Sequence, residues 1–190
     1  VRSGRWAARV KEEVENVRDS VGVLDLCGFS RFARSGACAA EWLRGRIAGA
    51  LPKVGRMNLG YFPDPRGRIL TEMSLVRKGE DAFTLITAAP AQWHDYEVLW
   101  RDGLPEGVNL TDHTTEVTTL IVTGPTARDL FESIGTQADL CLGWLSHQDA
   151  TVAGQPWRLF RVSFAGELGW EIHARFDDMP ASYDAVLGAG

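Results

Sequence analysis

The sequence predicts an α+β fold of mainly antiparallel sheets with helices packed on them. Short segments in which apolar and polar residues alternate are interleaved with segments of helical apolar spacing. Tight turn signals such as Pro63–Gly67 and Lys78–Asp81 join neighbouring strands, as in antiparallel hairpins. A chain of 190 residues that is 45% apolar and 24% charged can bury a substantial core.

Helices are predicted where apolar residues recur every three or four positions, or where a proline opens a first turn. The predicted ranges are 6–19, 37–48, 90–101, 124–134 and 179–188. The apolar stripe of the first helix consists of Trp6, Val10, Val14 and Val17. In the helix over 90–101, the side chains expected to face inward are Trp93, Tyr96 and either Leu99 or Trp100.

Strands are predicted where apolar residues alternate or run together between turns. The predicted ranges are 21–26, 29–35, 57–62, 68–77, 82–88, 108–112, 116–123, 151–153, 157–164 and 170–174. Residues 135–150 show no clear period and receive no element.

Composition limits the function classes. The net charge of −5 argues against non-specific nucleic-acid binding. The sequence contains no run of 18 apolar residues, so no membrane span is expected. Three cysteines without a C-x-x-C spacing, and four scattered histidines, argue against a disulfide framework or a zinc site. With no apolar signal core in residues 1–6, these features predict the cytoplasm. Because the chain starts with Val1, we expect it to be part of a longer protein.

A glycine hairpin over residues 161–173 is the first candidate binding element. Gly166 and Gly169 allow positive φ or close approach of another chain or ligand. Glu167 and Glu171 lie four residues apart, and their spacing does not decide which one points inward. A carboxylate there can accept two parallel N–H groups from a flat heterocycle. The alternative is a surface hairpin with solvated glutamates.

Glu72 is the candidate catalytic carboxylate. The period of two places it on one face of its strand beside Leu70 and Ser74. It is either a solvent-side glutamate or a buried one whose pKa would be raised and which could accept a proton. Arg77 follows on the same strand and is expected to be a surface charge. Gly124-Pro125 fits helix initiation better than a phosphate loop, because no Lys-Ser/Thr ending follows.

Several stretches of the chain form a recognisable series. They are Val21–Leu26, Gly67–Ile69 with Glu72 and Arg77, His94-Asp95, Gly124–Arg128 and Arg161–Glu171. In this order, over about residues 6–190, they resemble the folate-binding aminomethyltransferase family, which includes the glycine cleavage T-protein. The last stretch most resembles the C-terminal regions of dimethylglycine and sarcosine dehydrogenases.

The resemblance implies a tetrahydrofolate site. By the family pattern, Glu171 would pair with the pterin 2-amino and N3 groups, and Phe164 would line the folate. The backbone at Ala88 would line the pterin, and Leu59 stands where a tyrosine is common. Glu72 would replace the family's catalytic aspartate, where a fixed carboxylate could orient folate N5, accept its proton and stabilise the cationic centre.

Two departures from the family pattern leave alternatives open. Glutamate at 72 is one methylene longer than aspartate, and Leu59 lacks a hydroxyl. The first hypothesis is transfer of a one-carbon unit from an amine-derived donor to tetrahydrofolate, with a flavin dehydrogenase domain or subunit as partner. The alternatives are a non-catalytic folate-binding or scaffold module and a related demethylase. Residues 1–190 are expected to form one folate-binding domain, without the family's C-terminal barrel or a flavin domain.

Overall fold

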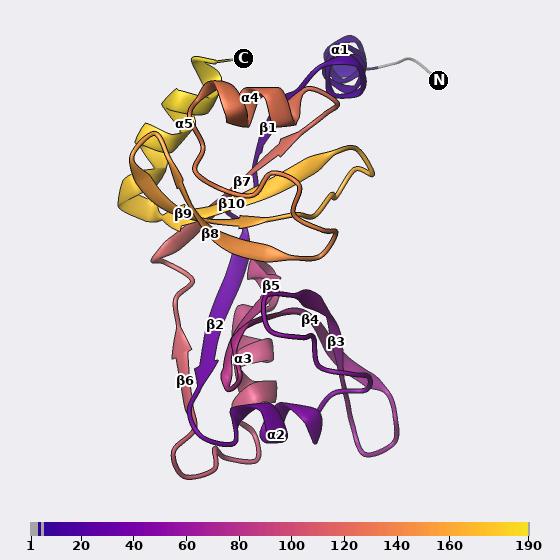
Figure 1. Ribbon diagram of the computed structural model, residues 1–190. Helices are drawn as coiled ribbons and strands as arrows, with labels where there is room; N and C mark the ends of the chain where they lie inside the picture. The colour runs from indigo at the N-terminus through magenta and orange to yellow at the C-terminus, as the bar shows by residue number, and fades with distance from the viewer. Residues whose placement is uncertain (1–3, 5, 190) are drawn as a thin grey trace. The chain divides into compact units, whose positions relative to one another are not determined.

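The computed structural model describes residue 4 and residues 6–189 (Figure 1). Residues 1–6, where no signal core was predicted, include residues 1–3 and 5, which lie outside the described residues. The chain divides into two compact units, Val1–Cys27 with Thr118–Gly190, and Gly28–Val117. Each unit contains a five-stranded antiparallel sheet, which confirms the predicted α+β class. No helix among the described residues is both long and apolar enough to cross a bilayer.

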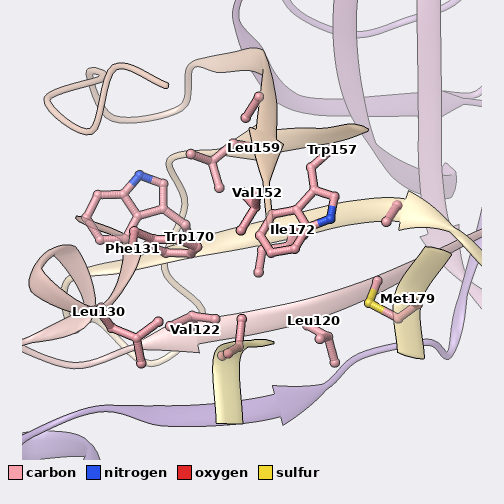
Figure 2. Close-up of a cluster of buried hydrophobic side chains, with 14 residues drawn as sticks. Leu120, Val122, Leu130, Phe131, Val152, Trp157, Leu159, Trp170, Ile172 and Met179 are labelled. Atoms are coloured by element: carbon pink, nitrogen blue, oxygen red, sulfur yellow. The ribbon is translucent and has the colours of Figure 1, made fainter. Parts of the chain in front are cut away.

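The first unit is built on a sheet with strand order β1-β7-β10-β9-β8. Its strands are β1 (Gly22–Asp25), β7 (Val117–Thr123), β8 (His147–Val152), β9 (Gln155–Phe160) and β10 (Gly169–Arg175). Its helices are α1 (Trp6–Asp19), α4 (Ala127–Ser133), the 3-10 turn η2 (Phe176–Asp178) and α5 (Met179–Leu187). Apolar side chains from one face of the sheet pack with α4 and α5 (Figure 2). Trp170 and Phe131 meet edge to face within this cluster, with ring centroids 5.4 Å apart.

The second unit is built on a sheet with strand order β3-β4-β5-β2-β6. Its strands are β2 (Phe29–Ser35), β3 (Met57–Pro63), β4 (Ile69–Gly79), β5 (Ala82–Ala88) and β6 (Asn109–Asp112). Its helices are α2 (Ala39–Arg44), the 3-10 turn η1 (Ala89–Ala91) and α3 (Gln92–Trp100). The core lies between these helices and one sheet face, where Phe32, Leu85 and Leu75 form a row across three strands.

Several predicted boundaries and side-chain orientations are wrong. The strand predicted over 157–164 ends at Phe160, and β8 begins at His147, four residues before the strand predicted over 151–153. Trp93 is 77% exposed, because α3 instead turns Val98, Leu99 and the carboxylate of Asp95 inward. The stripe of α1 is amphipathic, yet none of its residues is buried. Helical spacing identifies an apolar side but does not show whether another element covers it.

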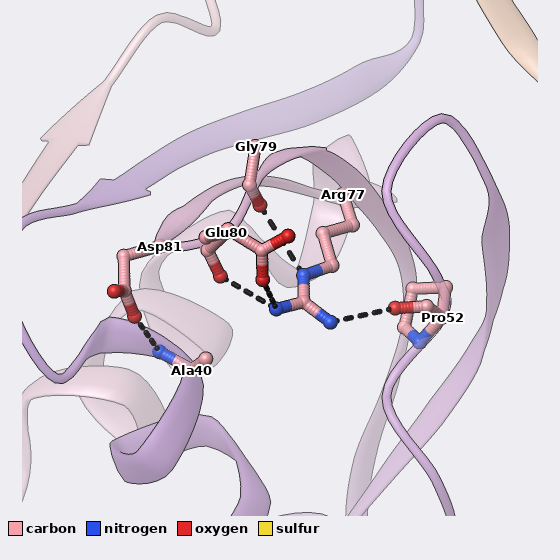
Figure 3. A network of polar contacts seen from close by, with 6 residues as sticks. All are labelled: Ala40, Pro52, Arg77, Gly79, Glu80 and Asp81. Carbon is pink, nitrogen blue, oxygen red and sulfur yellow. Dashed lines mark hydrogen bonds and ion pairs between the residues drawn. The ribbon is translucent and has the colours of Figure 1, made fainter.

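Arg77, predicted to be a surface charge, instead ties together two segments of the second unit (Figure 3). Its guanidinium donates to the carbonyls of Pro52 (3.2 Å), Gly79 (3.2 Å) and Glu80 (2.7 Å), and to the Glu80 carboxylate (3.0 Å). Only 14% of its side chain is exposed. Because a planar guanidinium can serve several acceptors at once, Arg77 fixes the turn between β4 and β5.

Arg34 is a buried cation whose charge is not neutralised. It has no exposed surface, and none of its three guanidinium nitrogens has a hydrogen-bond partner among the described residues. Its guanidinium carbon lies 3.7 Å from the ring centroid of Trp42, whose ring also lies 4.4 Å from the guanidinium carbon of Arg46. Burial, with a smaller effect of Arg46, lowers the pKa of Arg34 to about 10. The folded chain therefore tolerates this charge at a cost, offset in part by the ring.

Replacing Arg34 with methionine should raise the free energy of unfolding by about 1–2 kcal/mol at pH 7, because the buried charge is removed while the volume is kept. Folding lowers the pKa of Arg34, so its charge destabilises the folded state fully at pH values below about 10. This cost fades as the pH rises through about 10, where the folded protein releases the proton. Urea denaturation at pH 7 measures the change. Arg46→Met is the control, since Arg46 pairs with Asp102 at 2.5 Å and is partly exposed. A stability loss in Arg34→Met would contradict the prediction.

Candidate functional site

Three of the predicted site residues lie on one face of the sheet in the second unit. Leu59 is opposite Ser74 and Ser74 is opposite Ile86, so these side chains form one row. Glu72 lies two residues before Ser74, and Ala88 lies two residues after Ile86. Because residues two apart on a strand share a face, Leu59, Glu72 and Ala88 all point away from the core row of Phe32, Leu75 and Leu85.

Glu72 is exposed on this face. The sequence allowed either a solvent-side or a buried glutamate, and the structure has the solvent-side one. Tyr61 lies directly opposite it on β3. The carboxylate forms no hydrogen bond or ion pair with another described residue. Leu59 is 53% exposed and Ala88 is exposed, so the face offers apolar surface around one available carboxylate.

Glu171 lies on the second candidate surface, the face of the β10 sheet opposite the core cluster. Trp170, Ile172 and Ala174 point into that cluster, so Glu171 and His173 point the other way. Nε2 of His173 lies 3.0 Å from Oε2 of Glu171, where its N–H donates to the carboxylate. Only 18% of the Glu171 side chain is exposed. The carboxylate is therefore held in place while Oε1 accepts no hydrogen bond from the described residues.

Aromatic and basic side chains continue this face across β9 and β8. Phe160 is opposite Glu171 and also opposite His147, and its ring lies 4.2 Å from that of His173. Arg158 donates to Nδ1 of His147 (3.1 Å) and pairs with Asp149 (2.5 Å). Phe160, His147 and His173 are all buried. Glu171 therefore lies beside His173 and Phe160, at one end of a row of mostly buried side chains.

Phe164, the predicted folate-lining aromatic residue, lies on a loop rather than in a strand. Residues 161–168 join β9 to β10 without regular structure, and Phe164 is 80% exposed. The two glycine roles expected here are both present. Gly166 has φ +89°, and a Cβ on Gly169 would lie 2.9 Å from Oγ1 of Thr123.

The His94-Asp95 pair forms a polar cluster at the start of α3. Asp95 is fully buried and accepts hydrogen bonds from Oγ1 of Thr87 and from Nδ1 of His94, the latter at 2.9 Å. Thr87 immediately precedes Ala88 on β5. The buried carboxylate therefore fastens the end of β5 to α3, next to one of the predicted site residues.

Sequence reasoning missed Phe160, His173, His147 and Arg158 as neighbours of Glu171. The alternation of Trp170, Ile172 and Ala174 with Glu171 and His173 could have revealed His173. Phe160 and His147 depend on the register of β8, β9 and β10, and the boundary error at Phe160 concealed that register.

Comparison with known proteins identifies relatives of the whole chain. The GCVT N-terminal domain family matches residues 2–190. Human mitochondrial dimethylglycine dehydrogenase is 31% identical over 193 residues, which cover 100% of this chain and 22% of that protein. An aminomethyltransferase of Thermus thermophilus is 31% identical over 189 residues, which cover 95% of this chain and 52% of that protein. The chain thus spans about a fifth to a half of the length of these relatives.

A solved structure supports the same fold. The glycine cleavage system aminomethyltransferase T of Bartonella henselae superposes with a TM-score of 0.81 at 23% identity. The match covers 93% of this chain and 48% of that one. At this identity the likeness establishes the fold.

Proposed function

Since this chain belongs to the GCVT N-terminal domain family, we propose that it takes part in tetrahydrofolate-dependent one-carbon transfer. Its relatives are aminomethyltransferases and enzymes named for dimethylglycine and sarcosine, so the chain is an aminomethyltransferase-like domain. The proposed donor is an aminomethyl or methylene group formed by oxidation of an N-methyl amine.

The observation that carries the proposal is the state of Glu171. Its side chain is mostly buried and held through Oε2 by His173, and Oε1 is available as an acceptor. A pterin presents its 2-amino and N3 N–H groups side by side, which a carboxylate can accept as parallel hydrogen bonds. The residues present therefore fit this group. We propose that Glu171 binds and orients the pterin edge.

Glu72 is proposed to act as the proton acceptor of the transfer. Tetrahydrofolate, when bound, supplies the nitrogen that accepts the one-carbon unit. An ionised carboxylate that has no competing partner can take the proton released there and stabilise positive charge in the transition state. Leu59 and Ala88 share its sheet face and would supply apolar contact surface. Phe164 is proposed to add an aromatic contact from the 161–168 loop.

A flavin dehydrogenase domain or subunit is the proposed partner, because oxidation of the amine must precede the transfer. Sarcosine oxidase subunit alpha of a Corynebacterium species is 32% identical over 175 residues, covering 87% of this chain and 18% of that subunit. The amine itself is proposed only as a small N-methyl compound. The cytoplasm stays a prediction.

Calorimetric titration with 5-formyltetrahydrofolate, a reduced-folate analogue, tests the proposal. We expect micromolar binding by the wild-type protein. Glu171→Ala should weaken it by about 100-fold or more, because two charge-assisted hydrogen bonds are lost. Glu167→Ala is the matched control, since it removes the same charge four residues away, and its affinity should change less than about twofold.

Absence of binding by the wild-type protein, or equal affinity in the two variants, would refute the assignment of the pterin to Glu171. Circular dichroism of each variant shows whether the sheet is intact.

A further inference from the structure

Arg161 in the first unit lies over Trp170, and Arg128 is close enough to Arg161 to affect it electrostatically. The guanidinium carbon of Arg161 lies 5.1 Å from the ring centroid of Trp170 and 5.7 Å from that of Trp144. Arg128 lies on α4 one turn before Phe131, whose ring packs edge to face on Trp170. Burial lowers the pKa of Arg161, and the nearby charge of Arg128 lowers it further. Both cations therefore lie in the same small region.

Neither cation is neutralised by a carboxylate of the described residues. The side chain of Arg161 donates one hydrogen bond, from Nη1 to the carbonyl of Gly169 at 3.0 Å, and the side chain of Arg128 makes none with a described residue. The acidic residues nearest in sequence, Asp129 and Glu167, form no ion pair with either. Two like charges that repel one another in a partly buried place, in a chain of net charge −5, lack the counter-charge that such a place requires.

Arg128, Trp170 and Ser163, which follows Arg161 by two residues, each carry a buried donor that is unused. Nε of Arg128, Oγ of Ser163 and Nε1 of Trp170 all lack a partner among the described residues. Trp170 has no exposed surface, and its indole nitrogen lies on the side of the ring away from Leu130 and Val122 (Figure 2). Buried donors in folded proteins are almost always satisfied, so each of these donors calls for an acceptor.

We propose that Arg128, Arg161, Ser163 and Trp170 form a binding site for a small oxyanion, a carboxylate or a phosphate group. A guanidinium packed against aromatic rings keeps its N–H groups in its own plane, where they can bind two oxygens in parallel. Trp144 is 50% exposed and Arg161 is half-buried, so the region is in contact with solvent. The site uses none of the residues assigned to the pterin and does not depend on folate binding.

Nuclear magnetic resonance titration of the protein tests this site, with the tryptophan indole N–H signals as the readout. Inorganic phosphate is added in one arm and glutarate in the other, with chloride adjusted to constant ionic strength. The Trp170 signal is identified by its loss in Trp170→Phe. We expect a saturable shift of this signal in at least one arm, and the arm that binds more tightly identifies the anion class.

The variants decide whether the arginines are responsible. Arg128→Gln should weaken binding about tenfold or more, because it removes a charge and a donor pair. Arg161→Lys should also weaken it, because lysine lacks the planar fork. Arg175→Gln is the control, because it removes the same charge from an exposed residue at the end of β10. This control variant should change the affinity less than about twofold. Absence of a saturable shift in both arms, or equal affinities in Arg128→Gln and Arg175→Gln, would overturn the proposal.

Discussion

Replacing Glu72 with alanine should lower the rate of one-carbon transfer to tetrahydrofolate by about 10²–10⁴-fold, the usual contribution of a general base. Folate affinity should stay within about twofold, because Glu171 is the proposed binding carboxylate. Stability should change by less than about 0.5 kcal/mol, since Glu72 is exposed and bonds to no other described side chain. The assay mixes the protein with its oxidising partner and offers dimethylglycine or sarcosine as the amine. The measured quantity is the rate of methylenetetrahydrofolate formation.

Two further variants sharpen this test. Glu97→Ala removes an exposed glutamate from α3 in the same unit and should leave the rate unchanged. Glu72→Asp restores the residue that the family pattern carries, and a faster rate would support descent from a catalytic aspartate. An unchanged rate in Glu72→Ala would favour the non-catalytic folate-binding module. Transfer from a different class of methyl donor in a substrate screen would favour the demethylase alternative.

Replacing Gly124 with alanine should lower the free energy of unfolding by about 3–5 kcal/mol. Gly124 has φ +135°, a conformation that an L-residue adopts only under strain. A Cβ there would lie 2.2 Å from the carbonyl oxygen of Ser20 and 2.8 Å from Cα of Val21. These are backbone atoms, so the segment between α1 and β1 would have to move. Urea denaturation followed by circular dichroism measures the loss.

Gly67→Ala is the matched control for this prediction. Gly67 also has a positive φ, +79°, but a Cβ there would meet nothing within 4 Å. Its cost should therefore be only the left-handed backbone penalty of about 1–2 kcal/mol. Equal losses in the two variants would show that the close approach at Ser20 is not the source of the Gly124 effect.

The local elements and several backbone roles follow from short stretches of the sequence. Strands 29–35 and 82–88 and helix 6–19 have the predicted bounds, because their side-chain periods and flanking turn residues are local signals. The roles of Gly166 and Gly169, and helix initiation after Gly124-Pro125, also follow from the chemistry of single residues. Residues close in sequence carry this information without reference to the rest of the chain.

What each face of a helix or strand packs against depends on the folded arrangement of the whole unit. Period two states that Glu72 and Met73 point in opposite directions, but the packing of α2 and α3 makes the Met73 face the core and leaves Glu72 exposed. Likewise, Phe160 stands opposite Glu171 because of the β9–β10 register across the 161–168 loop. Burial and register depend on partners distant in sequence. For that reason Glu171 could be predicted from the sequence, whereas its contacts with His173 and Phe160 could not. The burial of Asp95 in place of Trp93 could not be predicted either.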